Sequence, residues 1–160
     1  MNINISIATI EQKSVLRNMM ELYFYDMSEF DDETDRLELD KNGLYGYSWL
    51  DYYWVEYGRF PYLMTIDSKL AGFALIREVE PQVFSVAEFF VVRKYRKMGV
   101  GSVLINEMFK LHKSKWIIST PIKNIVAQSF WRKSVRSASA GKYAEYLIED
   151  GRRMEWAFGG

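Results

Sequence analysis

The segment 88–101 constrains the fold of this chain most strongly. It begins as an apolar strand, continues through a basic turn and ends with glycines at 99 and 101, where an amphipathic helix starts. A helix start leaves about four backbone N–H groups unpaired and carries a partial positive charge, and glycines let an anion approach them closely. The segment therefore predicts an anion site, the alternative being a solvated turn without a ligand. Four basic residues surround it: Arg93, Lys94, Arg96 and Lys97.

Spacing separates the kinds of loop that bind phosphate. A P-loop needs Gly-Lys followed by Ser or Thr, which this chain lacks, and the dinucleotide fingerprint needs a third glycine where Leu104 stands. What remains is R-x-x-G-x-G after a strand that reads F-x-V, followed later by Asn124-x-x-Ala127-x-x-Phe130-Trp131. These motifs resemble the acyl-CoA signature of the GNAT N-acetyltransferase superfamily, most strongly over residues 60 to 135.

Strand-like and helix-like segments alternate along the chain. Alternating or apolar runs predict strands at 3–8, 62–66, 70–79, 83–92, 116–119, 142–149 and 152–157. Helical spacing predicts helices after the Thr9/Gln12 capping box and at 49–57, 100–112 and 124–133, and Gly72 suggests a bulge. The resemblance implies an α/β (α+β) GNAT-like fold: a mostly antiparallel mixed sheet of six or seven strands, flanked by about four helices and splayed around a CoA cleft. We expect one domain over residues 1–160.

Composition excludes several chemistries. The chain has 160 residues and no cysteine, so disulfides, thiolate zinc sites and cysteine nucleophiles are impossible, and we expect no metal. The only histidine, His112, falls on a predicted helix without a G-x-S-x-G motif, which argues against a Ser-His-Asp triad. The balance of 21 basic and 21 acidic residues argues against a nucleic-acid partner. The start lacks a basic leader and no apolar run approaches the ~18 residues of a membrane span, so we expect a cytoplasmic protein without a membrane partner.

The resemblance assigns residues to acetyl-CoA, the expected co-substrate. In the family the pyrophosphate lies on backbone N–H groups of the turn, and the strand before it supplies main-chain contacts to pantetheine, including one N–H for the thioester oxygen. Arg96 fills the family's Arg/Gln position. Asn124 matches a cofactor-contacting asparagine, and it also fits an N-cap. The N–H groups are those of Lys97, Met98, Gly99, Val100, Gly101 and Ser102, and the strand contacts are Phe89, Phe90 and Val91.

The reaction implied is attack of a neutral primary amine on the acetyl thioester. Glu88 is the candidate base because it is a carboxylate in an apolar run, although it also fits a structural carboxylate. The resemblance also places Trp131 at the cofactor, in the position where many members carry a tyrosine acid. Either Tyr143 or Ser129 then acts as the acid, or the thiolate leaves unassisted. The alternative function is a non-catalytic acyl-CoA-binding or sensor protein.

The acceptor is the least constrained part. Between residues 21 and 40 there are nine carboxylates and one arginine, with aromatic clusters at 23–25 and 45–57. Acidic and aromatic groups suit a cationic small amine or a basic peptide amine. The alternative is that the aromatics are partly core and the carboxylates a solvated face. A homodimer is a further expectation from the family. The carboxylates central to the cationic hypothesis are Glu29, Asp31, Asp32 and Glu33.

Overall fold

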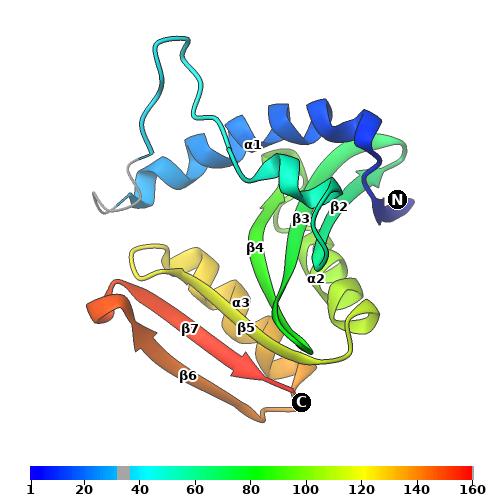
Figure 1. Cartoon of the computed structure of the whole chain (residues 1–160). Helices are drawn as coiled ribbons and strands as arrows, with labels where there is room; N and C mark the ends of the chain where they lie inside the picture. Colours follow the sequence, from blue (N-terminus) through cyan, green and yellow to red (C-terminus); the bar gives the residue numbers. More distant parts are fainter. Residues whose placement is uncertain (32–36, 160) are drawn as a thin grey trace.

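The computed structural model describes residues 1–31 and 37–159 and contains one seven-stranded mixed sheet with the order β1-β2-β3-β4-β5-β7-β6 (Figure 1). Only the β4–β5 pair is parallel. This architecture confirms the expected GNAT-like α/β class. The strands are β1 Ile3–Ile7, β2 Arg59–Ile66, β3 Lys69–Glu80, β4 Val83–Val91, β5 Lys115–Pro121, β6 Tyr143–Ile148 and β7 Arg153–Phe158. The α-helices described are α1 Lys13–Met27, α2 Val100–Leu111 and α3 Ile125–Ala138.

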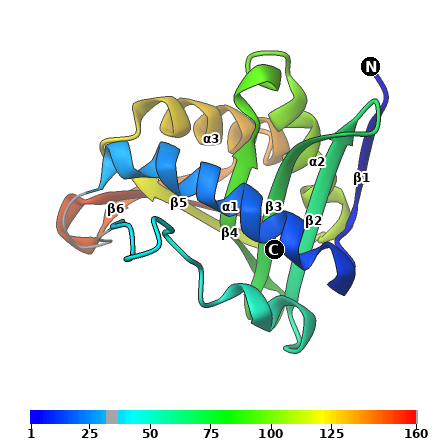
Figure 2. The same cartoon turned by 90° about the horizontal axis from the view of Figure 1, so that it is seen from above.

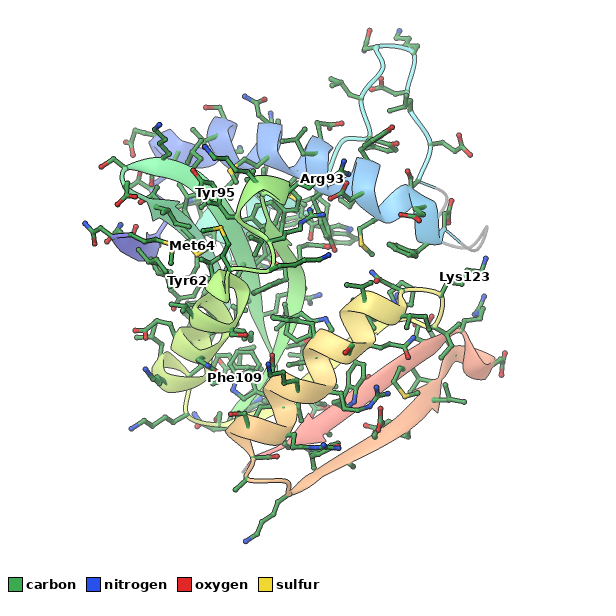
Figure 3. All side chains as sticks on the ribbon, turned by 180° about the vertical axis from the view of Figure 1, so that it is seen from behind. Tyr62, Met64, Arg93, Tyr95, Phe109 and Lys123 are labelled. Atoms are coloured by element: carbon green, nitrogen blue, oxygen red, sulfur yellow. The ribbon has the colours of Figure 1, made fainter. Side chains whose placement is uncertain are left out.

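The helices cover both faces of the sheet. Helix α1 crosses β2, β3 and β4 (Figure 2), and its buried residues share a cluster with Leu63, Phe73, Leu75 and Phe90. Helices α2 and α3 lie side by side on the other face (Figure 3), where α2 packs over the β2 residues Tyr62 and Met64. Each helix buries the apolar stripe that its sequence spacing predicts. Within the part of the chain described, no helix has the length and apolar character needed to cross a membrane.

Strands β4 and β5 pair over a short stretch only. Their register runs from Val83 opposite Lys115 to Ser85 opposite Ile117 and then stops. Beyond Ser85 the two strands diverge (Figure 1), so the edge of β4 from residue 86 to residue 91 has no neighbouring strand on the β5 side. We call residues 86–91 the splayed edge of β4.

A bulge in β4 sets which side chains face α1. Leu75 pairs with Glu88 and Ile76 with Val86, so Ala87 is an extra residue in β4. Val86 and Phe89 both pack toward α2 and α3, although strict alternation would place them on opposite faces. The bulge therefore turns Glu88 toward α1, and the alternation of residues alone does not predict this.

Three local expectations have clear outcomes. The register shift opposite Met64 and Thr65 falls beside Gly72, which confirms the bulge there. Thr9 and Gln12 form the expected capping box. The segment 49–57 does not form an α-helix: it contains only a five-residue 3-10 helix, η3 Leu50–Trp54. Its aromatic and β-branched residues lose rotamer freedom in an α-helix, and Gly58 follows directly.

Candidate functional site

The turn before α2 presents a run of unpaired backbone donors. Gly99 is the N-cap of α2 in the left-handed conformation, with φ of 78°, which glycine adopts readily. The first hydrogen bond of the helix runs from the Val103 N–H to the Gly99 carbonyl. The six N–H groups from Lys97 to Ser102 have no hydrogen-bond partner among the described residues. These donors and the helix dipole together fit an anion such as a diphosphate.

Aromatic side chains lie between this turn and α3. A Cβ at Gly101 would come within 3.3 Å of the Phe130 ring, so a larger residue there would require the ring to shift. The Phe89 ring lies 5.5 Å from Phe130 and 5.1 Å from Trp131. Trp131 is only 6% exposed. The position that carries a tyrosine in many members of the GNAT superfamily is thus filled here by the buried indole of Trp131.

Backbone groups of the splayed edge alternate between β3 and open space. The Val92 N–H donates to the Ala71 carbonyl of β3, so Val92 and Phe90 direct their backbone groups toward β3. Phe89 and Val91 direct theirs toward the side where β5 has diverged. The Val91 carbonyl accepts a 2.8 Å hydrogen bond from Arg96 Nε. An extended ligand therefore finds the main-chain groups of Phe89 and the N–H of Val91, whereas the Val91 carbonyl is already bound by Arg96.

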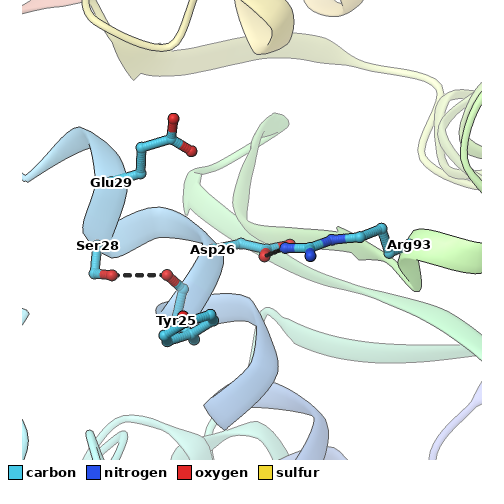
Figure 4. Close-up of a pocket in the computed structure, with 5 residues that line it drawn as sticks. All are labelled: Tyr25, Asp26, Ser28, Glu29 and Arg93. Carbon is cyan, nitrogen blue, oxygen red and sulfur yellow. Dashed lines mark hydrogen bonds and ion pairs between the residues drawn. The ribbon is translucent and has the colours of Figure 1, made fainter.

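Asp26 ties the end of α1 to the basic turn. Its carboxylate pairs with Arg96 and, at 2.6 Å, with Arg93. Burial raises the pKa of Asp26, but the hydrogen bonds from the two guanidinium groups outweigh it and lower the pKa overall. A cavity of about 360 Å³ lies beside this pair (Figure 4) and is lined by Tyr25, Asp26, Ser28, Glu29 and Arg93.

Glu88 lies among tyrosines on the α1 side of the sheet. Burial, followed by the charge of Glu88 and a hydrogen bond with it, raises the pKa of Tyr23. Burial and then the same charge raise the pKa of Tyr47, and they raise that of Tyr53 to about 12. All three hydroxyls thus stay protonated near neutral pH. The Tyr53 hydroxyl is buried and has no hydrogen-bond partner in the described structure.

Asn124 is the N-cap of α3, which was one of the two roles expected for it. Its Oδ1 accepts a 3.0 Å hydrogen bond from the Ala127 N–H, and the residue is 7% exposed. The amide Nδ2 faces the Met27 sulfur of α1 at 4.0 Å. Asn124 therefore caps the helix and contacts α1.

Most of the described carboxylates of the acidic stretch bind backbone and arginine groups of this chain, whereas Glu29 lines the cavity beside Asp26. Glu21 accepts from the N–H groups of Tyr45 and Gly46, and Asp40 accepts from those of Asn42 and Leu44. Asp31 accepts from the Leu37 N–H. Asp32 and Glu33 lie outside the described residues. The aromatic residues divide: Phe24, Tyr45 and Tyr47 pack on the core, whereas Trp49, Tyr52 and Tyr57 are exposed.

His112 lies at the far end of α2 from the turn. Its Nε2 is 2.8 Å from the Tyr62 hydroxyl, and its ring packs against Phe60 and Phe84 at 4.6 Å. Burial lowers its pKa, in part offset by Glu78. His112 thus packs the core. In the described part of the chain, no three acidic or histidine side chains group to hold a metal ion.

Two residues of this site were missed by reading the sequence. Tyr23 was predicted on the apolar face of the first helix and among the aromatics of the acidic stretch, but not beside Glu88, and Asp26 was counted only as one of the nine carboxylates. The same helical spacing that puts Tyr23 with Met19 and Met20 packs it against the sheet, but the spacing does not show which strand residue it meets. No local signal pairs Asp26 with arginines about 70 positions later.

The fold and the site combine a helix start that carries unpaired N–H groups with an open strand edge beside it. A profile described as the acetyltransferase (GNAT) family matches residues 17–135. The chain therefore belongs to the GNAT acetyltransferase family. A search of curated proteins gives no significant match.

Solved structures share the fold at low sequence identity. An acetyltransferase from Thermus thermophilus superposes with a TM-score of 0.74 at 10% identity, over 100% of this chain and 98% of that one. The PaiA N-acetyltransferase from Thermoplasma acidophilum, in complex with coenzyme A, has a TM-score of 0.70 at 16% identity and covers 100% of both chains. A streptothricin acetyltransferase described as putative, from Bacillus anthracis with acetyl coenzyme A, has a TM-score of 0.55 at 17% identity, over 69% and 67%.

Proposed function

We propose that this protein is a cytoplasmic N-acetyltransferase that transfers the acetyl group of acetyl-CoA to a primary amine. The observation that carries the proposal is the run of six unpaired N–H groups from Lys97 to Ser102 beside the splayed edge of β4. These donors fit the pyrophosphate, and the main chain at Phe89 and Val91 fits the pantetheine arm. Two of the structures with the same fold contain coenzyme A or acetyl coenzyme A.

The chain supplies charge stabilisation and a proton acceptor to this reaction. The amine nitrogen forms a bond to the acetyl carbon, the bond from that carbon to sulfur breaks, and the amine proton passes to Glu88. A backbone N–H of the splayed edge stabilises the negative charge that develops on the thioester oxygen, a contribution of about two to three powers of ten in other enzymes. Glu88 receives the proton directly or through water.

The leaving thiolate needs no strong acid. A thiol has a pKa of about 8.5, so its anion is a tolerable leaving group near neutral pH. Trp131 cannot donate a proton, and its packing against Phe89 holds the aromatic cluster in place. The same tryptophan supports the second candidate, a protein that binds acyl-CoA and does not turn it over.

One assay separates the two candidates. Release of the CoA thiol from acetyl-CoA is followed across a panel of primary amines, with acetyl-CoA affinity measured by calorimetry in parallel. We expect thiol release that depends on an amine and equals the amount of amide formed. Tight binding without turnover would establish the sensor, and absence of binding would overturn both candidates.

A further inference from the structure

Three of the arginines described are half-buried, and they differ in their partners. Arg59 pairs with Glu56 at 2.8 Å, and Arg132 pairs with Glu145 at 2.5 Å. Arg153 of β7 has no carboxylate within ion-pair distance in residues 1–31 and 37–159. Its Nε and Nη2 approach only the Ser119 hydroxyl, at 3.4 and 3.2 Å. A guanidinium has five N–H donors, so most of those on Arg153 are unused.

The side chain of Arg153 lies on the face of the sheet that also carries Glu88. Met154, Trp156 and Phe158 of β7 pack toward α3, so by alternation Arg153 points to the opposite face. The same argument holds for Ser119, because Ile118 packs on the α3 side. These two residues and Glu88 therefore share the α1 side of the sheet.

Glu88 of β4 and Ser119 of β5 lie equally far along their strands from the last pair that joins β4 to β5. The last β4–β5 pair is Ser85 with Ile117. Ser119 comes two residues later, and Glu88 comes three residues later with one of them in the bulge. Glu88 thus stands on one side of the divergence, and Ser119 with Arg153 stands on the other.

The pKa of Tyr23 responds to charges on both sides of the divergence, that of Glu88 and that of Arg153. The charge of Glu88 raises the pKa of its buried hydroxyl, after burial itself, and the charge of Arg153 lowers it. The hydroxyl therefore lies within electrostatic reach of a carboxylate from β4 and a guanidinium from β7. An acceptor that reaches Glu88 with its amine thus finds nearby a guanidinium that no described carboxylate contacts within ion-pair distance.

We propose that Arg153 binds an anionic group of the acceptor, so that the substrate is an amine that carries a carboxylate, as an amino acid does. This inference rests on the proposed function and names the substrate class of that site. A planar guanidinium matches a carboxylate through two parallel hydrogen bonds, and Ser119 orients it. The same donors fit a phosphate, which the test separates. The structure thus favours an acceptor with an anionic group over a purely cationic one.

The test compares Arg153→Gln with Arg152→Gln. Arg152 is the adjacent arginine, is exposed and donates to the Glu149 carbonyl, so it controls for the loss of one positive charge. Four acceptors are assayed: an amino acid, the amine left when its carboxylate is removed, an aminoalkyl phosphate and a polyamine. We expect R153Q to raise KM for the amino acid about tenfold to a hundredfold, R152Q to change it less than about twofold, and R153K to fall between them. The matching amine without a carboxylate should respond to neither variant.

A second measurement keeps the test independent of turnover. Binding of an N-acetyl amino acid is titrated by calorimetry against each variant, with acetyl-CoA affinity as the check of folding. If R153Q is the only variant that binds the N-acetyl amino acid more weakly, the inference is supported, even if the protein turns over no amine. The absence of turnover would contradict the proposed function and not this inference. Equal binding to all variants, or a preference for the polyamine, overturns the inference and leaves the transferase proposal standing. A preference for the aminoalkyl phosphate that is lost in R153Q would assign the site to phosphate and overturn the carboxylate assignment.

Discussion

The cofactor side and the acceptor side of this molecule are built from different groups. On the proposed cofactor side, the groups assigned to the ligand are backbone N–H groups of residues 97–102 and main-chain groups of Phe89 and Val91. On the proposed acceptor side, the groups assigned to the substrate are side chains, Glu88 and Arg153, with Tyr23 between them, from three separate elements. A backbone site depends on a short local motif, whereas a side-chain site depends on how distant segments pack.

The largest effect on activity is expected from the removal of Glu88, the proposed proton acceptor on the acceptor side. Glu88→Gln removes the proposed proton acceptor at nearly constant volume and should lower kcat by about two to four powers of ten. Acetyl-CoA affinity should change little, because the cofactor groups are backbone. Steady-state thiol release and calorimetry measure the two quantities. A variant that loses stability but keeps its kcat would make Glu88 a structural carboxylate that holds Tyr23.

The next effect is specific to the cofactor side. Ser102→Pro deletes one of the unpaired N–H groups at a position in the first turn of α2, where proline fits the helix. We expect acetyl-CoA to bind about tenfold to a hundredfold more weakly, the value of a hydrogen bond to a charged group. Ser102→Ala keeps the N–H and serves as the matched control. If S102P and S102A bind acetyl-CoA equally, the backbone cradle is not the binding site.

Asp26 is the contact between the two sides, and its removal should have a smaller effect. Asp26→Asn loses the pairs with Arg93 and Arg96, of which Arg93 is 75% exposed, so screening limits the loss to about 1 kcal/mol of unfolding free energy. The pKa of Asp26 is lowered in the folded protein, so this contribution is present above the ordinary value of 3.8 and disappears as pH falls through the folded value. Urea unfolding of both proteins at neutral and acidic pH measures it. A difference that persists at low pH would contradict the ion-pair origin.

The smallest effect is expected at His112, which lies outside both the cofactor side and the acceptor side, and concerns only stability. Burial lowers the pKa of His112 below the ordinary value of 6.5, so the unfolded chain takes up the proton first. Stability should therefore fall as pH drops below about 6.5 and level off below the folded value. His112→Gln should remove this decline and leave acetyl-CoA affinity unchanged. Equal decline in both proteins would assign the titration to another group.

The contrast also explains what the sequence could predict. The glycines at 99 and 101, the strand before them and the Asn124 motif lie within about 40 residues and carry their own spacing, so the class of fold and the cofactor side followed from them. The seven strands followed from apolar alternation. The predicted helix at 49–57 did not form, because the structure divides the five aromatic residues of this segment between the core and the surface.

The acceptor side could not be predicted because it depends on register. The bulge at Ala87 turns Glu88 toward Tyr23, and the early end of β4–β5 pairing separates the strands. Arg153 is one of two adjacent arginines after the Asp150-Gly151 turn, and only the packing of Trp156 and Phe158 decides which of them faces the site. Charge counting pointed to a cationic acceptor, whereas most of the described acidic side chains in that stretch already bind groups of this chain.

The most direct test of the cofactor side is the response of backbone amides to acetyl-CoA. In the ¹⁵N-labelled protein, we predict that titration with acetyl-CoA shifts the amide signals of residues 97–102 and of Phe89 and Val91. Signals from the C-terminal turn of α2, near His112, should stay in place. Shifts confined to other parts of the chain, or no shifts at saturating acetyl-CoA, would contradict the assignment of this turn as the binding site.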